Sequence, residues 1–197
     1  MTETVAVIGC GNAKLDEPAE ARELYTSNYF GLKREYGEHF ADRLVVLSAE
    51  HDLIRGWETI EPYDTTADDR DRDVWVDEVC WSLRSPFVLL DYADEILLLA
   101  GSEYKSVFFD ALERERQSLG DESIVETTEI IDVFGESGAK GIGEQMGYLR
   151  EAVDADLRQP DGDRDQQTGL DRFAGRTKVA ATDGGQAANA GKSGADK

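Results

Sequence analysis

The stretch RLVVLSAEHDL, from Arg43 to Leu53, sets how the rest of the chain is interpreted. Its four apolar residues at 44–47 are typical of a short buried β-strand. The run leads directly into polar side chains that include Ser48 and His51, and the chain has only two histidines. A titratable group at the end of a buried strand indicates a functional site, provided that other strands end in a similar way.

Strands and helices alternate on both sides of this stretch. Apolar runs predict strands at 4–10, 43–48 and 94–101 and a weaker strand at 123–131, whereas helical spacing predicts helices at 27–40, 73–85, 106–119 and 141–153. Ser27 is placed to cap the first of these helices. The segments 11–25 and 60–66 are predicted to be loops. Such alternation is typical of α/β proteins, so we predict a single three-layer domain over residues 1–153, with a mostly parallel sheet and helices on both faces.

The last part of the chain, residues 154–197, has no such periodicity. It is rich in Gly, Ala, Asp and Gln and contains one aromatic residue, Phe173. Such a segment cannot bury enough apolar surface to offset the loss of chain entropy. We therefore predict a disordered polar tail.

The chain is strongly acidic, with 42 acidic and 21 basic residues and a net charge of −21. Only four lysines precede the tail, at positions 14, 33, 105 and 140. An acidic, lysine-poor surface is favoured in a cytoplasm at molar salt, where short screening lengths reduce self-repulsion. We therefore expect a halophilic source. In molar salt the global charge neither supports nor excludes a nucleic-acid partner.

The remaining composition indicates a cytoplasmic protein. Cys10 and Cys80 are far apart and form no disulfide or zinc pattern, and the two histidines add no metal site. There is no basic leader followed by an apolar segment, and no apolar run is long enough to cross a bilayer. We expect neither a metal nor a membrane partner, and the sequence leaves the cofactor and the oligomeric state open.

Three predicted strands end in polar sequences: IGCGNAK, LSAEHD and LAGSEYK. Ligands of open parallel sheets bind beyond the carboxyl ends of the strands, so these loops are expected to converge. The loop GESGAKGIG, before the last helix, combines a flexible backbone with a helix N-terminus, which suits a phosphate or carboxylate. The alternative is that these are ordinary turn residues. The predicted substrate-binding residues are Cys10, Lys14, Ser48, Gly101, Tyr104, Lys140, Gly141, Gly143 and Gln145.

Four motifs, GCGNAKLDEPAEARELYTSNYF, VVLSAEHDLI…IEPYDTT, LLLAGSEYKSVFFDAL and GIGEQMGYL, occur in this order. In these motifs the chain resembles a family catalogued as domain of unknown function 6884, whose members are sometimes labelled YaaA-like peroxide-stress proteins. The resemblance covers about residues 4–153 and implies an α/β domain with a polar pocket, without an established reaction. The family usually has glycine after the histidine, where this chain has Asp52, and basic residues where it has Asn12 and Ala13. Lys14 and His51 are the best-supported correspondences.

The candidate chemistry centres on His51, which could act as a general acid or base with Glu61 or Asp64 beside it. Tyrosines could stack on a base or sugar, and Lys14 could hold an anion. These features predict an enzyme that acts on a nucleotide or a nucleic-acid-linked group, as a hydrolase or a glycosidic-bond transferase. The alternative is a non-catalytic module that binds an anionic small molecule or nucleic acid, for instance in stress defence. The acidic and basic run DDRDRD, residues 68–73, is predicted to be a solvated surface.

Overall fold

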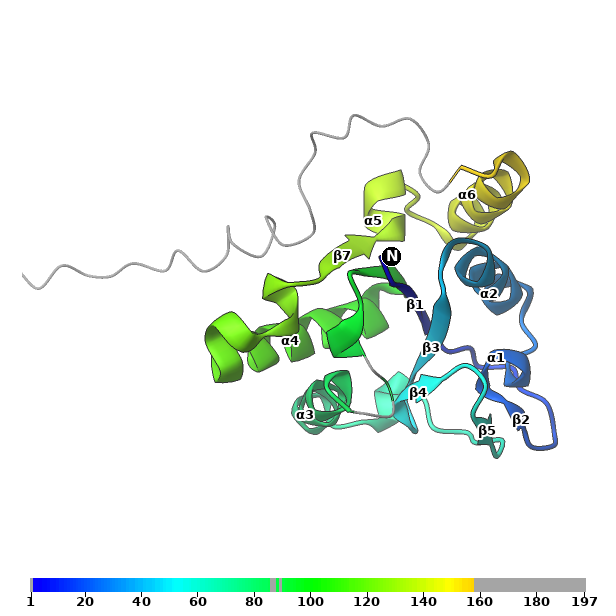
Figure 1. Ribbon diagram of the computed structural model, residues 1–197. Helices are drawn as coiled ribbons and strands as arrows, with labels where there is room; N and C mark the ends of the chain where they lie inside the picture. The colour runs from blue at the N-terminus through cyan, green and yellow to red at the C-terminus, as the bar shows by residue number, and fades with distance from the viewer. Residues whose placement is uncertain (1, 86–87, 89, 158–197) are drawn as a thin grey trace, which may run out of the picture.

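A five-stranded sheet forms the centre of the computed structural model, which describes residues 2–85, 88 and 90–157 (Figure 1). The strand order is β4-β3-β1-β6-β7, with β4 antiparallel to β3 and the other neighbours parallel. The strands are β1 (Thr4–Gly9), β3 (Arg43–Ser48), β4 (Asp52–Arg55), β6 (Glu95–Leu99) and β7 (Glu129–Asp132).

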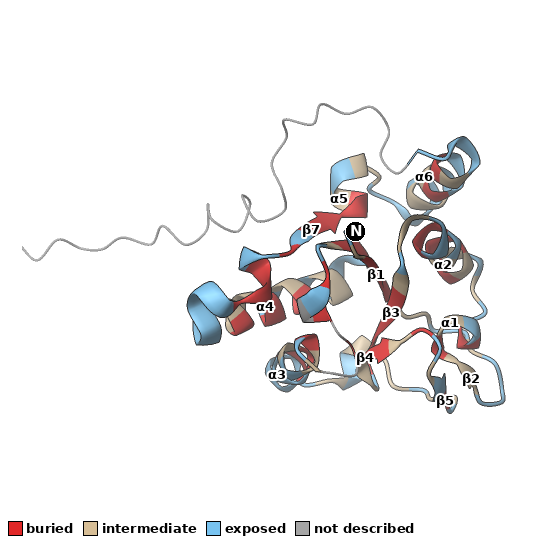
Figure 2. Cartoon of the chain, viewed as in Figure 1, coloured by how far each residue is buried: buried red, intermediate tan, exposed pale blue. Residues whose placement is uncertain are grey.

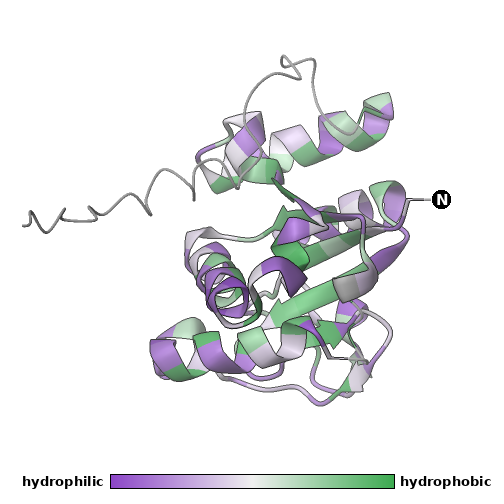
Figure 3. Ribbon diagram, turned by 60° about the vertical axis from the view of Figure 1, so that its left-hand side comes forward, coloured by the Kyte–Doolittle hydropathy of each residue, from purple (hydrophilic) through white to green (hydrophobic). Residues whose placement is uncertain are grey.

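Helices cover both faces of this sheet. On one face lie α3 (Arg72–Leu83) and α4 (Ser102–Leu119), and on the other lie α1 (Ala21–Leu24), α2 (Asn28–Phe40) and α6 (Ile142–Ala155). Within β1, Val5 and Val7 belong to the first core, whereas Ala6 and Ile8 belong to the second. Since successive side chains point to opposite faces, a strand covered on both sides is apolar throughout. The buried, hydrophobic strands are visible in Figures 2 and 3, and the predicted three-layer α/β domain is confirmed.

Helix α2 packs directly against the central strand β1. The predicted cap is present, because Ser27 Oγ accepts a hydrogen bond from the Phe30 backbone N–H at 3.2 Å. A Cβ atom on Gly37 would lie only 2.9 Å from the Cβ of Ala6, so glycine permits this close approach. The approach brings the first turns of α2 to the end of β1, where the candidate site lies.

Several short elements differ from the sequence prediction. The predicted loop at 11–25 contains β2 (Ala19–Glu20) and α1, and β2 pairs with β5 (Thr59–Ile60). The β4 strand and α5 (Val133–Ser137) were also not predicted. These elements are only two to five residues long and depend on partners distant in sequence, so local periodicity does not reveal them. The 3₁₀ turns are Ala67–Asp69, Leu90–Tyr92, Gly120–Glu122 and Ile124–Glu126, and the last of these replaces the start of the strand predicted at 123–131.

The C-terminal helix continues two residues beyond the predicted domain boundary at 153. Its apolar stripe is partly as predicted, because Leu149 is buried, but Ile142 is 62% exposed. Residues 158–197, most of the predicted tail, lie outside the described residues. Within the part of the chain that the structure describes, no helix has the length and apolarity to cross a membrane.

Candidate functional site

The carboxyl ends of β1 and β6 meet where the chain changes direction across the sheet. The connection after β1 runs through α2 on one face, and the connection after β6 runs through α4 on the other. Such a switch point is where open α/β sheets bind ligands. Here the Cys10 thiol donates a hydrogen bond to the Tyr104 hydroxyl at 3.2 Å, which joins the end of β1 to the first turn of α4.

A chain of hydroxyl groups joins Tyr25 and Tyr63 to Ser48, at the end of β3. The Ser48 and Tyr63 hydroxyls share a hydrogen bond at 2.8 Å, and those of Tyr63 and Tyr25 share another at 2.7 Å. Burial raises the pKa of Tyr25, Tyr63 and Tyr104, and the nearby Cys10 raises it further in each case. These tyrosines therefore stay protonated near neutral pH and can donate hydrogen bonds to a ligand.

His51 lies in the tight turn between β3 and β4. Ser48 Oγ accepts hydrogen bonds from the backbone N–H groups of Glu50, at 3.0 Å, and His51, at 3.1 Å. The imidazole of His51 meets the ring of Tyr63 edge-on, with centroids 5.3 Å apart. Its Nε2 atom is buried and, within the described part of the chain, has no hydrogen-bond partner. Because buried polar atoms are normally paired, the unpaired Nε2 is an unusual feature of this turn.

Lys14 approaches the same tyrosine. Its Nζ lies 4.2 Å from the centroid of the Tyr63 ring and 5.8 Å from that of Tyr25, and it donates a hydrogen bond to the Asn12 carbonyl at 3.3 Å. The structure thus gathers Lys14, Ser48 and His51 around Tyr63. Lys14 lies more than thirty residues before Ser48 in the sequence, and the sheet brings the two segments together.

A second lysine, Lys33 on α2, lies at the end of β1. It is 3% exposed, and its Nζ donates a hydrogen bond to the carbonyl of Gly9 and lies 4.8 Å from the centroid of the Tyr29 ring. Burial lowers the pKa of Lys33 to about 8, and the interaction with Cys10 opposes that shift. Lys33 is not among the site residues predicted from the sequence. Its position within the apolar stripe of α2, four residues after Tyr29, is the feature that could have identified it.

The loop before α6 is brought to this edge mainly through Gln145. Gln145 Oε1 accepts a hydrogen bond from the Tyr29 hydroxyl, and its Nε2 donates to the Ala139 carbonyl at 3.3 Å. Burial raises the pKa of Tyr29 to about 12. In contrast, the predicted binding residues Lys140, Gly141 and Gly143 are exposed.

The predicted carboxylate partners of His51 are placed less favourably. Glu61 and Asp64 are both exposed, and neither supplies the missing partner of Nε2. The carboxylate next to His51 in sequence, Glu50, accepts a hydrogen bond from the Thr65 hydroxyl. The described residues contain no group of three or more His, Cys, Asp or Glu side chains arranged to hold a metal ion.

The N-terminus of α4 also faces the switch point. Gly101 is its exposed N-cap and has no side chain to cap the first N–H groups. The nearby Lys105 is not a free cation, because its Nζ lies 2.9 Å from Asp132 Oδ2. Asp132 also caps α5 by accepting a hydrogen bond from the Gly135 N–H at 3.0 Å. The anion-binding potential of the edge therefore depends mainly on Lys14, Lys33 and open backbone N–H groups.

The arrangement combines three chemical capacities at one edge of the sheet. The imidazole can accept or donate a proton, tyrosine rings and hydroxyls can contact a planar polar group, and lysines can attract an anion. Such a set suits a ligand that carries both a ring system and a negative charge.

Comparison with known proteins gives one match. A family model described as "Family of unknown function (DUF6884)" matches residues 5–151. Neither a curated protein nor a solved structure matches the chain.

Proposed function

The chain belongs to the DUF6884 family, and we propose that the carboxyl edge of its sheet is the site of an enzyme that acts on a nucleotide or a nucleic-acid-linked group. The proposed class is a hydrolase or a glycosidic-bond transferase. His51 would exchange a proton with the reacting group, and Lys14 would hold the negative charge of the substrate.

The observation that carries this proposal is the free Nε2 atom of His51. It is buried without a partner in the described structure, and the ring stands against Tyr63, whose face is occupied by the Lys14 ammonium. A histidine titrates near neutral pH, and general acid–base catalysis requires the transferring atom to be within hydrogen-bonding reach of the substrate. An ammonium a few ångströms from an aromatic ring suits a phosphate attached to a nucleoside.

The two lysines at this edge contrast with the net charge of −21 of the whole chain. Over most of the surface, carboxylates would repel a phosphate. Lys14 and Lys33 both lie at the carboxyl edge of the sheet. Among the described residues, no carboxylate forms a hydrogen bond or an ion pair with Lys33. Cations close to aromatic rings and backbone donors can attract an anion locally even when the overall charge is unfavourable.

A second candidate function is a non-catalytic module that binds a nucleotide or nucleic acid. The positions of Glu61 and Asp64 favour it, because both are exposed and, within the described structure, neither forms a hydrogen bond with the His51 ring that could orient it. Catalytic histidines are commonly oriented by such a group. The two candidates share a ligand class and differ in whether a bond is broken.

A panel of nucleosides and nucleotides separates the two candidates. The purified protein is screened by thermal shift in molar salt, and each compound that stabilises it is incubated and analysed by chromatography for a released base, phosphate or sugar. An enzyme with His51→Asn should keep the thermal shift and lose product formation, whereas His39→Asn, on the exposed part of α2, should retain both. Stabilisation without product from the unmodified protein would favour the binding module. Absence of stabilisation by any compound would contradict both.

A further inference from the structure

The turn that carries His51 is held in place by an arginine from a distant part of the chain. We propose that Arg70 is a positioning residue for His51: by binding the β3–β4 turn and α3 at once, it fixes the backbone from which the imidazole projects. The proposal deepens the proposed function and rests on it for the role of His51. The part of the proposal that concerns the backbone of the turn can be tested without a ligand.

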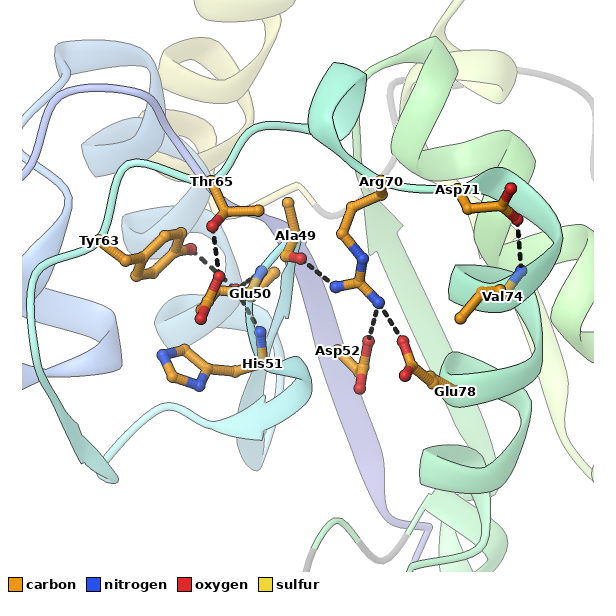
Figure 4. Close-up of polar contacts among 11 residues, drawn as sticks. Ala49, Glu50, His51, Asp52, Tyr63, Thr65, Arg70, Asp71, Val74 and Glu78 are labelled. Carbon is orange, nitrogen blue, oxygen red and sulfur yellow. Dashed lines mark hydrogen bonds and ion pairs between the residues drawn. The ribbon is translucent and has the colours of Figure 1, made fainter.

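Arg70 makes three polar contacts that join two elements (Figure 4). Its guanidinium donates hydrogen bonds to the Ala49 carbonyl and to the Glu78 carboxylate, and Nη2 lies 3.5 Å from Asp52 Oδ1. Ala49 and Asp52 flank His51 within two residues, whereas Glu78 lies on α3. The contacts therefore clamp the turn against the helix.

This arginine belongs to the run DDRDRD, which the sequence analysis predicted to be a solvated surface. The side chain of Arg70 is only 16% exposed, and its guanidinium carbon lies 5.6 Å from the centroid of the buried Trp75 ring. A planar guanidinium can stack on an aromatic ring while its fixed donors reach separate acceptors. Arg70 is thus a partly buried connector and not a surface charge.

The side chain of His51 cannot secure its own position. Its Nε2 is unpaired within the described residues, and its aromatic contact is the edge-on approach to Tyr63. The direction of the imidazole consequently depends on the backbone of the turn. Inside the turn, Ser48 Oγ holds the Glu50 and His51 N–H groups, and on the outside Thr65 binds the Glu50 carboxylate. Arg70 holds the opposite side, as Figure 4 shows.

The backbone at Asp52 gives a reason for the clamp. Asp52 has φ 56°, a left-handed conformation that costs energy for residues other than glycine and persists where the surroundings impose it. The same residue pairs with Arg70. The Asp52 carboxylate therefore ties this left-handed position to the arginine.

The electrostatic setting agrees with this pairing. Burial raises the pKa of Asp52 to about 6, while Arg70 opposes the shift and the neighbouring Glu78 adds to it. The guanidinium of Arg70 thus pairs with two carboxylates, those of Asp52 and Glu78, which repel each other. If Arg70 were removed, both would face each other without compensation, and the polar connection between the turn and α3 would be lost.

Arg84 offers a matched control for the loss of a tie to α3. It caps the other end of that helix, lies 3.3 Å from the Glu115 carboxylate and donates a hydrogen bond to the Glu122 carbonyl at 2.6 Å. Arg84→Met therefore removes one ion pair and one carbonyl hydrogen bond at the far end of α3, whereas Arg70→Met removes two ion pairs and one carbonyl hydrogen bond at the turn. Both variants are expected to weaken global stability.

Hydrogen exchange of the full-length protein, measured by NMR in molar salt, distinguishes positioning from general stabilisation. In Arg70→Met, the Glu50 and His51 amides should exchange about tenfold faster than the change in global stability explains, and the His51 imidazole signals should move while those of His39 stay. In Arg84→Met, the exchange rates of the two amides should change only as much as the change in global stability predicts, and both histidines should keep their signals. Arg70→Lys should reproduce the local effect, because one ammonium cannot match the fork of contacts.

Unchanged turn amides and His51 signals in the folded Arg70 variants would overturn the proposal, as would the same local response in Arg84→Met. If Arg70→Met does not fold, the result with Arg70→Lys decides. A positive result together with a His51→Asn variant that still forms product in the nucleotide panel would leave Arg70 as a clamp of the turn and reject only the catalytic role of His51.

Discussion

The buried ammonium of Lys33 should produce a large and specific dependence of stability on pH. Lys33 is 3% exposed, and burial lowers its pKa from 10.5 to about 8. Between these two values the unfolded chain binds a proton that the folded chain does not, so stability attributable to this residue rises with pH. At about 1.4 kcal/mol per pH unit, the difference corresponds to about 3 kcal/mol.

Lys33→Met isolates this contribution. The free energy of unfolding of the unmodified protein, minus that of the variant, should increase by about 3 kcal/mol as the pH rises from about 8 to about 10.5. Denaturant titration of both proteins in molar salt measures the difference, and ionisation of the tyrosines largely cancels in the subtraction. Lys140→Met, at an exposed position, should give a constant difference. A constant difference for Lys33→Met as well would refute the inference of a buried ammonium with a lowered pKa.

Three further predictions concern salt, the C-terminus and the cysteines. The free energy of unfolding should rise from dilute to molar salt, as screening weakens repulsion within a chain of net charge −21, and a flat profile would remove the halophilic interpretation. Truncation after residue 157 should leave the unfolding transition in denaturant unchanged. Truncation after Val153 should lower the free energy of unfolding by about 1 kcal/mol, because α6 continues to Ala155. Equal losses for the two truncations would contradict this prediction. Iodoacetamide should alkylate Cys10 about tenfold faster than Cys80 in the folded protein, as measured by peptide mass spectrometry. The reason is that burial, and after it the nearby Glu115 carboxylate, raises the pKa of Cys80, whereas Cys10 lies near the Lys33 ammonium. Equal alkylation rates would contradict this prediction.

The fold could be predicted where local pattern and burial agree. The runs at 5–8, 44–47 and 96–99 are apolar because both faces of each strand are covered, and this pattern is readable without a structure. The antiparallel strand β4 could not be predicted in the same way. It is four residues long and begins at Asp52, a residue other than glycine with a left-handed φ of 56°.

The site could be predicted only to the extent that strand ends share an edge. That rule places Cys10, Ser48 and His51 at one edge of the sheet, as the sequence analysis proposed. It says nothing of which helical side chains reach that edge. Lys33 is a charged residue within the apolar stripe of α2, and Arg70 belongs to a run of charged residues, but tertiary packing buries Lys33 and partly buries Arg70. Such residues emerge when the helices are placed on the sheet.

Binding of the ligand at His51 is tested most directly by the NMR signals of the His51 imidazole. The chain has only two histidines, so a spectrum of the imidazole carbons and protons contains one candidate, His51, and one internal control, His39. During titration with a nucleotide that stabilises the protein in the thermal-shift panel, the His51 signals should shift in proportion to occupancy, while those of His39, which is paired with Asp156 at 2.8 Å, should not move. Saturable binding that leaves the His51 signals unchanged would contradict the account.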